Sequence, residues 1–384
     1  MIAQLWRGIR VFLGVGFITL ALLVLVLEGA YFAYHVAKER FWGSRAVFER
    51  VDHPYWHDAW YAGWQHRLGQ MTQNSVYDPY RGWHLPRVSE SGLHVDGKGI
   101  RLTVHPMETD SAATRQVLML GGSTMWGYSA RDEYTIPSLV AQRLAQHGVT
   151  DVKVINLASI GFNTTQGAIT LLLELRRGNT PAAVVSLDGV NEVGIIYQGE
   201  SPGEVYAQRL AERQFDHSSF WREAARLRQH LHGTALAEGM LLRSLGLAKR
   251  PTMEPGPLCA QIAPYYAELV RSVDALAREH GFPIFYLSTP TLARSHKRRT
   301  VWEAWLAGTS RDFQELTVRC GEAVDSLLAP RRGKVYFPMD SLYDGDTTSV
   351  FIDHYGHVTE RANGVIADRI VALLLPALQP AGRK

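Results

Sequence analysis

Several features that define whole classes of protein are missing from this sequence. There are only two cysteines in 384 residues, with no Cys-x-x-Cys motif and no Cys/His cluster at metal-ligand spacing, so we expect no structural zinc site. Lys and Arg (40) nearly balance Asp and Glu (37), and no block of basic residues occurs. We therefore expect no nucleic-acid partner. With 46% hydrophobic residues, the composition is that of an ordinary globular protein that can bury a large core.

The two cysteines, Cys259 and Cys320, leave their chemical state open. If the domain faces an oxidising compartment, they could form one disulfide, and otherwise they are two buried thiols. Their spacing in the sequence does not distinguish these states.

The longest apolar stretch lies near the N-terminus. Residues 11–27 contain no charged side chain, and the apolar character resumes after Glu28, which is enough to cross a bilayer. We predict an uncleaved transmembrane anchor. A cleaved signal peptide is the alternative because Arg7 and Arg10 precede the stretch, but the stretch exceeds a usual signal h-region and no clear small-x-small site follows it. Basic residues flank both of its ends, so charge bias does not set the orientation.

From residue 116 onward, short apolar runs alternate with stretches of helical periodicity, which is typical of βαβ units. Strands are predicted at 116–121, 152–158, 182–188, 283–289 and 334–337. Helices are predicted at about 135–147, 165–177, 261–280, 311–329 and 358–375. This order predicts an α/β fold with a flavodoxin-like, doubly wound sheet of five parallel strands, which binds ligands at the carboxyl ends of its strands.

The remaining sequence divides into further segments. A stretch rich in tryptophan and tyrosine precedes the first strand, and we expect its aromatic residues to pack onto the main domain or to lie at the bilayer interface rather than to stack on a ligand. A stretch with helical spacing and a Pro/Gly-rich end interrupts the main domain as a candidate cap. The predicted segments are a tail (1–10), a transmembrane anchor (11–36), an aromatic-rich connector (37–115), the main domain (116–376) with its helical insertion (205–255), and a C-terminal tail (377–384).

A serine follows the first predicted strand directly. The segment Gly121-Gly122-Ser123 places Ser123 just past the strand end, with two glycines that permit a tight turn beneath it. Such a position suits a nucleophile. The segment lacks the Gly-Lys-Ser/Thr of a phosphate loop, the G-x-G-x-x-G of a dinucleotide site and the G-x-S-x-G of α/β-hydrolases. Taken alone, a serine in this place is more often a turn or N-cap residue.

Polar groups also follow the second and third predicted strands. Gly161 permits close backbone approach, and Thr164 or Thr165 can cap the next helix. Asn191 follows the third strand, where its side-chain amide could donate a hydrogen bond to a developing oxyanion. Taken singly, both Gly161 and Asn191 are more often ordinary turn residues, and for Asp188 a strand-terminal turn role is favoured over orienting a substrate.

An acid and two imidazoles lie just before the last predicted helix, at Asp353, His354 and His357. A histidine in this place could take the proton of a serine nucleophile, and the carboxylate could orient the imidazole. Two histidines in a loop are by themselves more often surface residues. The four segments together, however, fall in the order and at the strand ends that one active site would require.

This combination resembles the SGNH/GDSL hydrolase family over about residues 116–375. The resemblance implies a serine hydrolase without a metal or cofactor. It implies that Ser123 is the nucleophile, His357 the base and Asp353 its partner, with His354 as the alternative base. It also implies an oxyanion hole made of three hydrogen-bond donors, the Ser123 amide, the Gly161 amide and Asn191.

A second likeness concerns membrane-anchored members of this family that are associated with bacterial envelope polysaccharides. It is based on the aromatic-rich segment, on Gly99-Ile100-Arg101 and on Gly161-Phe162-Asn163-Thr164. It implies a periplasmic or extracellular domain, an acylated carbohydrate as substrate, and an association with the envelope polysaccharide machinery.

Three positions depart from the family pattern. Asp353 and His357 are separated by three residues, where the family has two. Gly122 stands where an aspartate usually precedes the nucleophile, and Glu192 follows Asn191 where aspartate is common. If the loop is already helical, residues at i and i+4 share a face, so Asp353 and His357 would still pair.

The sequence therefore predicts a membrane-anchored serine esterase or O-acyltransferase acting on acyl esters, with acetyl as the expected acyl group. Water as the acceptor makes it an esterase, and a sugar hydroxyl makes it an acyltransferase; the sequence does not distinguish them. Two alternatives stay open. One is a catalytically inactive protein of the same fold that binds polysaccharide or a partner enzyme, which the unusual Asp353/His357 spacing supports. The other is a cytoplasmic orientation with action on lipid-linked precursors.

Overall fold

The structure is a computed structural model that describes residues 14–20, 22–23, 25–27, 29–31, 33–34, 52–106, 114–197, 201–205 and 255–379. The chain divides into two units, one formed by residues 1–51 and 209–252 and the other by residues 52–208 and 253–384. Three predicted segments lie wholly or largely outside the described residues: the tail 1–10, the insertion 205–255 and the end of the tail 377–384.

An apolar helix occupies the described part of the first unit. Its segment Gly14–Tyr31 has a mean hydropathy of 2.0 and is long and apolar enough to cross a membrane. Large apolar side chains such as Phe17 and Leu25 are exposed along it. A membrane anchor and a signal sequence both fit these properties.

The second unit is built on a sheet of five parallel strands. They are β5 (Arg115–Gly121), β6 (Val152–Asn156), β7 (Ala183–Asp188), β8 (Ile284–Ser288) and β9 (Tyr336–Phe337), in the spatial order β6-β5-β7-β8-β9. Counted along the chain, this is the order 2-1-3-4-5 of a flavodoxin-like, doubly wound sheet. The α/β fold predicted from the sequence is confirmed, and each predicted strand overlaps an observed one.

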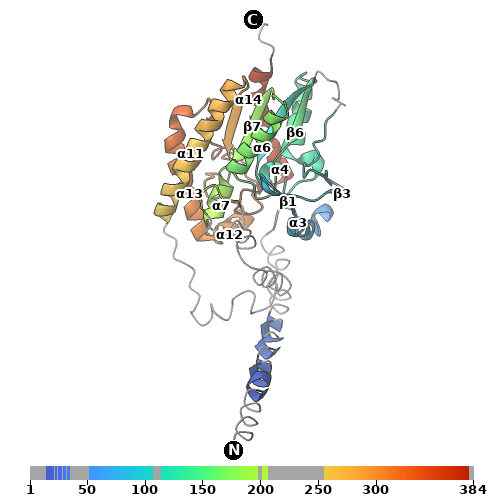
Figure 1. The fold of residues 1–384 in the computed structure, drawn as a ribbon, viewed down its shortest axis with the longest axis vertical. Helices are drawn as coiled ribbons and strands as arrows, with labels where there is room; N and C mark the ends of the chain where they lie inside the picture. Colours follow the sequence, from blue (N-terminus) through green and yellow to red (C-terminus); the bar gives the residue numbers. More distant parts are fainter. Residues whose placement is uncertain are drawn as a thin grey trace, which may run out of the picture. The chain divides into compact units, whose positions relative to one another are not determined.

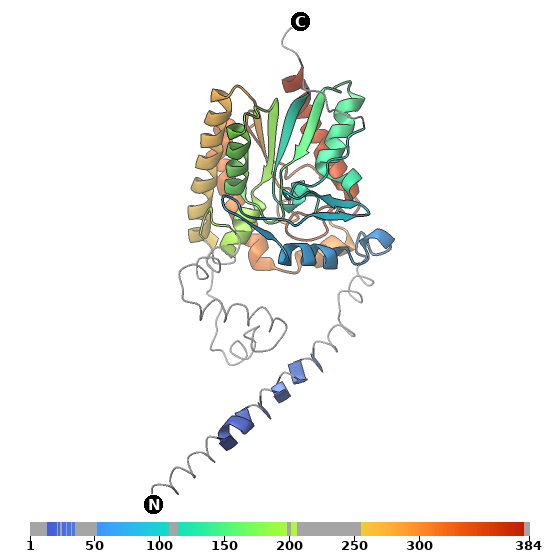
Figure 2. The same ribbon diagram turned by 45° about the vertical axis from the view of Figure 1, so that its right-hand side comes forward.

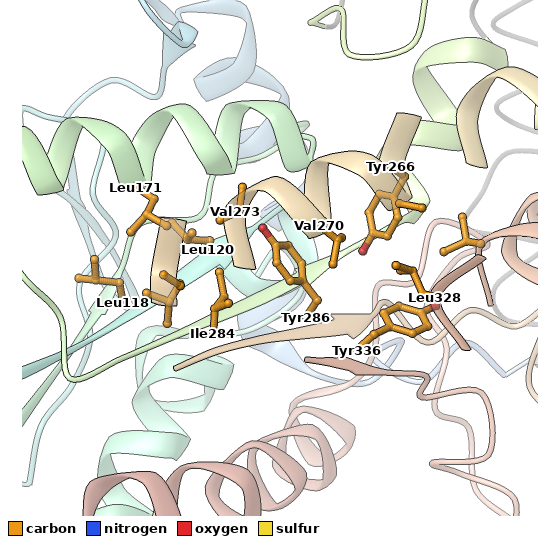
Figure 3. Close-up of a cluster of buried hydrophobic side chains, with 14 of the residues drawn as sticks. Leu118, Leu120, Leu171, Tyr266, Val270, Val273, Ile284, Tyr286, Leu328 and Tyr336 are labelled. Atoms are coloured by element: carbon orange, nitrogen blue, oxygen red, sulfur yellow. The ribbon is translucent and has the colours of Figure 1, made fainter. Parts of the chain in front are cut away.

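Helices cover both faces of this sheet (Figures 1 and 2). Two of them, α6 and α11, lie on one face, and α5 and α14 lie on the other (Figure 3). Threonine or asparagine side chains cap the first turns of α5, α6 and α14. The helices are α4 (Ser123–Trp126), α5 (Ile136–Gln146), α6 (Thr164–Arg176), α7 (Val190–Tyr197), α11 (Pro255–Glu279), α12 (Val301–Ala307), α13 (Arg311–Leu328) and α14 (Glu360–Leu378), with short 3-10 helices η2 (Asp132–Tyr134) and η3 (Ala329–Arg331).

Because both faces are covered, the central strands are mostly apolar, and Ser186, Asp188 and Ser288 are their polar residues. All residues of β7 and β8 are buried. One large cluster of buried side chains fills the space between the sheet and α11 (Figure 3), including Leu120, Val270, Ile284 and Tyr286. The register pairs Gly121 with Leu187, so the segments that follow β5 and β7 leave the sheet at the same edge.

The aromatic-rich segment belongs, from residue 52 onward, to the same unit as the sheet. It contains η1 (Ala59–Tyr61), α3 (Trp64–Gln73), and two hairpins formed by β1 (Val76–Asp78) with β2 (Gly82–His84) and by β3 (Val88–Glu90) with β4 (Leu93–Val95). Trp64 is buried, and its indole N–H donates to the Tyr128 carbonyl at 2.6 Å. Some of the aromatic residues therefore pack onto the main domain, whereas Tyr77 and Tyr80 are exposed. Trp42 lies outside the described residues.

Helix α11 begins at Pro255, earlier than the predicted start near residue 261. The Pro255-Gly256-Pro257 segment forms its first turn rather than the end of the insertion, because proline is tolerated where backbone N–H groups have no helical partner. Cys259 on α11 and Cys320 on α13 are joined by a disulfide. The bond ties together two helices that also pack closely on each other.

We expect the disulfide to contribute substantially to stability. The bond closes a loop between residues separated by 61 positions, which lowers the entropy of the unfolded chain by the equivalent of about 4 kcal/mol. Replacing both Cys259 and Cys320 with alanine should therefore lower the free energy of unfolding by about 2–4 kcal/mol, measured by urea denaturation. Wild-type protein treated with a reductant should unfold at the same urea concentration as this variant, and equal midpoints for oxidised and reduced protein would contradict the assignment.

Candidate active site

The serine at the end of β5 occupies the first position of α4. Ser123 follows Gly122, which is in an extended conformation at the helix N-cap. Gly121 has a φ of +137°, and a Cβ there would lie 2.4 Å from the Leu187 carbonyl oxygen, so only glycine fits. The close approach of β5 to β7 at this point places Ser123 at the carboxyl edge of the sheet.

Three predicted site residues form one hydrogen-bonded chain. The Ser123 hydroxyl lies 2.7 Å from His357 Nε2, and His357 Nδ1 lies 2.5 Å from Asp353 Oδ2. A neutral imidazole that donates from Nδ1 to the carboxylate leaves Nε2 free to accept the serine proton. Ser123 and His357 are both buried. This is the arrangement in which a serine, a base and an orienting acid act together.

The Asp353/His357 pair forms through a turn, not through a helix. Helix α14 begins only at Glu360, so the loop is not helical and the two residues pair by another route. The Asp353 Oδ1 atom accepts hydrogen bonds from the backbone N–H groups of Tyr355 (2.9 Å) and His357 (3.3 Å). Gly356 has a φ of +84°, and a Cβ there would lie 2.6 Å from the Thr289 side chain. The three residues between Asp353 and His357 are therefore accommodated by a tight turn that needs glycine.

The electrostatics of this turn favour a charged Asp353. Burial acts to raise the pKa of Asp353, but the charge and hydrogen bond of His357, together with the Tyr355 N–H, lower it below its usual value. An ionised carboxylate is what stabilises the imidazolium that forms when His357 takes a proton.

The alternative base, His354, is oriented elsewhere. Its ring packs against Phe313 (ring centroids 5.7 Å apart) and Tyr355 (4.4 Å). In the described part of the chain, no hydrogen bond joins His354 to Ser123, and its Nδ1 atom has no partner. Burial lowers the pKa of His354 despite the opposing charge of Asp353.

Residues that the sequence did not single out join the segment after Ser123 to the turn that contains His357. The Tyr128 ring stacks on the His357 ring, with centroids 4.1 Å apart and planes 16° apart. The Thr124 hydroxyl donates to the Gly356 carbonyl (3.1 Å), and the Ser129 hydroxyl donates to the Val358 carbonyl (2.7 Å). These contacts fasten the segment after Ser123 to the C-terminal turn. No signal in the sequence distinguished these residues from ordinary loop residues.

One predicted oxyanion donor, the Asn191 amide, lies beside the Gly122-Ser123 segment. The Asn191 Nδ2 atom donates to the Phe162 carbonyl at 2.6 Å, which leaves its second N–H available. Gly161, directly before Phe162, has a φ of +77°. A Cβ on Gly122 would lie 2.1 Å from Asn191 Nδ2. The Asn191 amide therefore lies against the residue that precedes Ser123, and this contact leaves no room for a side chain at Gly122.

The Glu192 carboxyl group, next to Asn191, is hydrogen-bonded through both of its oxygens. Its Oε1 atom accepts from the Thr164 N–H (2.6 Å) and the Thr164 hydroxyl, and its Oε2 atom accepts from the Gly189 N–H (3.0 Å). The carboxylate thus links the turn after β6 to the turn after β7. Neither Thr164 nor Thr165 caps α6 as expected; α6 begins at Thr164, so Asn163 holds the N-cap position and forms a capping box with Gln166.

Arg101, the last residue of the Gly99-Ile100-Arg101 segment, binds the backbone that follows α4. Arg101 is buried, and its guanidinium donates to the carbonyls of Gly127 (2.5 Å) and Ala130 (2.6 Å) and to Asp132 Oδ1 (3.0 Å). Burial lowers the pKa of Arg101, and the charge of Asp132 opposes this effect. A buried guanidinium with several acceptors fixes the backbone that follows α4.

Gly122 provides a test of the oxyanion arrangement. Its φ of −88° suits any residue, so alanine introduces no backbone strain, but the new Cβ must displace the Asn191 amide. We expect Gly122→Ala to lower kcat for ester hydrolysis by about 10²–10³-fold, the usual effect of losing one oxyanion donor. Steady-state kinetics with 4-nitrophenyl acetate measure this. Gly345→Ala, at an exposed position without a positive φ where a Cβ meets no atom, controls for the loss of a glycine, and equal rates in the Gly122 variant and wild type would contradict the arrangement.

Within the described residues, no group of three His, Cys, Asp or Glu side chains is placed to hold a metal ion.

Comparisons with known proteins give matches among solved structures only. No family model and no curated protein matches the sequence. Similar solved structures include a putative arylesterase from Agrobacterium tumefaciens strain C58 (15% identity, TM-score 0.39, covering 69% of this chain and 100% of that one), an acetyl xylan esterase (14%, 0.38, 67% and 99%) and TesA (16%, 0.35, 69% and 99%). At these identities and TM-scores the likeness does not indicate an activity.

Proposed function

We propose that this protein is a serine-dependent acyl-transfer enzyme of the SGNH type, with Ser123 as nucleophile, His357 as base and Asp353 as the acid that orients it. The observation that carries the proposal is the continuous chain of hydrogen bonds from Ser123 through His357 to Asp353. The Asn191 amide beside Gly122 supports it, because a donor is needed where the oxyanion forms. The unusual spacing of Asp353 and His357, which favoured an inactive protein, does not prevent their hydrogen bond.

The reaction would proceed through an acyl-enzyme. The Ser123 oxygen attacks the ester carbonyl while its proton passes to His357 Nε2, and the Ser123 and Gly161 amides with Asn191 stabilise the oxyanion. When the tetrahedral intermediate collapses, the bond to the alcohol breaks and His357 returns the proton to that alcohol. Water or an acceptor hydroxyl then attacks the acyl-enzyme and gives its proton to His357, which passes it to the Ser123 oxygen as the bond between the acyl group and Ser123 breaks.

We further propose that the substrate is an acyl ester, with acetyl as the expected group, on an envelope carbohydrate. The apolar helix Gly14–Tyr31 is long enough to anchor the protein in a membrane. The Cys259–Cys320 disulfide supports a domain outside the cytoplasm, since such bonds persist in oxidising compartments. Water as acceptor would give an esterase, and a sugar hydroxyl would give an O-acyltransferase.

The test uses the full chain in detergent with 4-nitrophenyl acetate as acyl donor, with and without an oligosaccharide acceptor. Release of 4-nitrophenol with free acetate indicates an esterase. Faster release with acetylated oligosaccharide as product indicates a transferase. Folded protein that neither releases 4-nitrophenol nor reacts with a fluorophosphonate probe would instead favour the inactive, carbohydrate- or partner-binding protein.

A further inference from the structure

A small cavity lies at the carboxyl end of β7, and its walls include both Asp188 and Glu192. Its volume is about 40 Å³, enough for about two or three water molecules. Three buried atoms on its walls have no hydrogen-bond partner within the described residues: Asp188 Oδ1, Tyr266 OH and Thr291 Oγ1. Buried polar atoms without partners are costly, so three of them around one cavity indicate a hydrated site.

Two carboxyl groups meet at this place in unequal surroundings. Glu192 accepts three hydrogen bonds, from the Thr164 N–H and hydroxyl and from the Gly189 N–H. Asp188 lines the cavity and accepts from the Ser186 hydroxyl, and its other oxygen has no partner among the described residues. Both side chains are buried. Three donors stabilise a charged Glu192, whereas little around Asp188 compensates a charge.

We propose that Asp188 and Glu192 are a pair of positioning residues for the oxyanion hole, in which Glu192 is ionised and Asp188 is neutral and hydrogen-bonded to water in the cavity. The inference rests on the proposed function only for the role of Asn191. Asp188 ends β7, Gly189 is held by Glu192, and Asn191 follows two residues later. A negative charge on Asp188 would repel Glu192 and weaken its hydrogen bonds to Gly189 and Thr164. The Asn191 amide would then be held less firmly in place.

The charged surroundings agree with this assignment. Burial and the charge of Glu192 raise the pKa of Asp188 to about 8, although the Ser186 hydroxyl lowers it. Within the described chain, the ionisable groups around Asp188 and its cavity are Glu192 on α7, Tyr266 on α11, Tyr286 on β8, Tyr336 on β9 and Arg294 in the loop after β8. The Arg294 guanidinium is already paired with Asp325 and Asp340, each at 2.6 Å.

The first experiment follows the pH dependence of ester hydrolysis. With 4-nitrophenyl acetate, wild-type kcat should fall above pH 8 as Asp188 loses its proton, and Asp188→Asn should shift this fall by at least one pH unit upward. Asp344→Asn, at an exposed position, is the matched control and should keep the wild-type profile. An alkaline fall that is the same in Asp188→Asn and wild type would overturn the positioning role.

The second experiment does not depend on activity. The folded state raises the pKa of Asp188 above its unfolded value, so it binds the proton more tightly, and stability is lost as pH rises from about 4 toward 8. Asparagine cannot ionise. The Tm of Asp188→Asn should therefore rise relative to wild type between pH 5 and pH 8. A Tm difference that does not change with pH would overturn the neutral Asp188, even if the enzyme is active.

A third measurement distinguishes water from a bound cation, and a further variant tests Glu192. Replacing NaCl with choline chloride at constant ionic strength should leave the wild-type Tm unchanged; a rise specific to Na⁺ would overturn the proposal. Glu192→Gln places an NH₂ against one of the two N–H donors, that of Thr164 or that of Gly189, and should lower kcat about 10²-fold with KM little changed. Glu192→Asp, which keeps the carboxylate, should recover part of this loss. No recovery would contradict the proposed role of the Glu192 carboxylate in holding Gly189 and Thr164.

Discussion

Ser123→Ala should abolish labelling by a fluorophosphonate probe and lower ester hydrolysis on the order of 10⁴–10⁶-fold. The reason is that the Ser123 hydroxyl is hydrogen-bonded to His357 Nε2 at 2.7 Å and forms the acyl-enzyme in the proposed mechanism. The measurement is probe labelling of the full chain in detergent, followed by kcat/KM for 4-nitrophenyl acetate. Alanine removes a single oxygen at a buried position, so the Tm should stay close to that of wild type.

Ser159→Ala is the matched control for this variant. Ser159 is buried at the same edge of the sheet, and its hydroxyl has no hydrogen-bond partner among the described residues. Its loss should therefore leave labelling and turnover close to wild type. Labelling that persists in Ser123→Ala but disappears in Ser159→Ala would show that Ser159 is the nucleophile and that the proposal is wrong.

His357→Ala should reduce kcat/KM on the order of 10⁴–10⁶-fold, while His354→Ala should leave it close to wild type. The two histidines are three positions apart, but only His357 contacts both Ser123 and Asp353. His354 packs against Phe313 and Tyr355 instead. The measurement is kcat/KM for 4-nitrophenyl acetate together with fluorophosphonate labelling of each variant.

Each histidine variant serves as the control for the other. Both remove an imidazole from the same turn, so loss of activity caused by general disruption of the turn would affect them equally. If His354→Ala is as inactive as His357→Ala at equal Tm, the proposed division of roles is wrong. If His357→Ala keeps its activity, the Ser123–His357 hydrogen bond has no catalytic role.

The fold followed from the sequence because its signals are local. Runs such as 116–121 and 182–188 are short, apolar and β-branched, and helical patterns separate them. Observed β5 and β7 match these runs to within one residue. Helix α6 also matches its prediction to within one residue, whereas α11 begins at Pro255 and not near residue 261, because whether Pro255 opens a helix depends on neighbours elsewhere in the chain.

The candidate site was predictable as a set of residues but not as an arrangement. Ser123, Gly161, Asn191, Asp353 and His357 all follow strands or precede a helix at one edge of a parallel sheet, and the order of the segments is enough to expect them together. Tyr128 and the role of Arg101 were not predicted. Stacking on His357 and binding carbonyls after α4 are contacts between distant segments, which residue types alone do not reveal.

The sequence by itself determined the α/β class, the strand runs, the apolar N-terminal stretch and the residue types available for acyl transfer, since these depend on composition and periodicity along the chain. Only the tertiary structure decided how the unusual spacing is accommodated. Gly356 turns the chain so that His357 reaches Asp353 and Ser123. It also decided that Gly122 leaves room for Asn191 and that Cys259 meets Cys320, because close approach between remote residues is set by packing and not by local sequence.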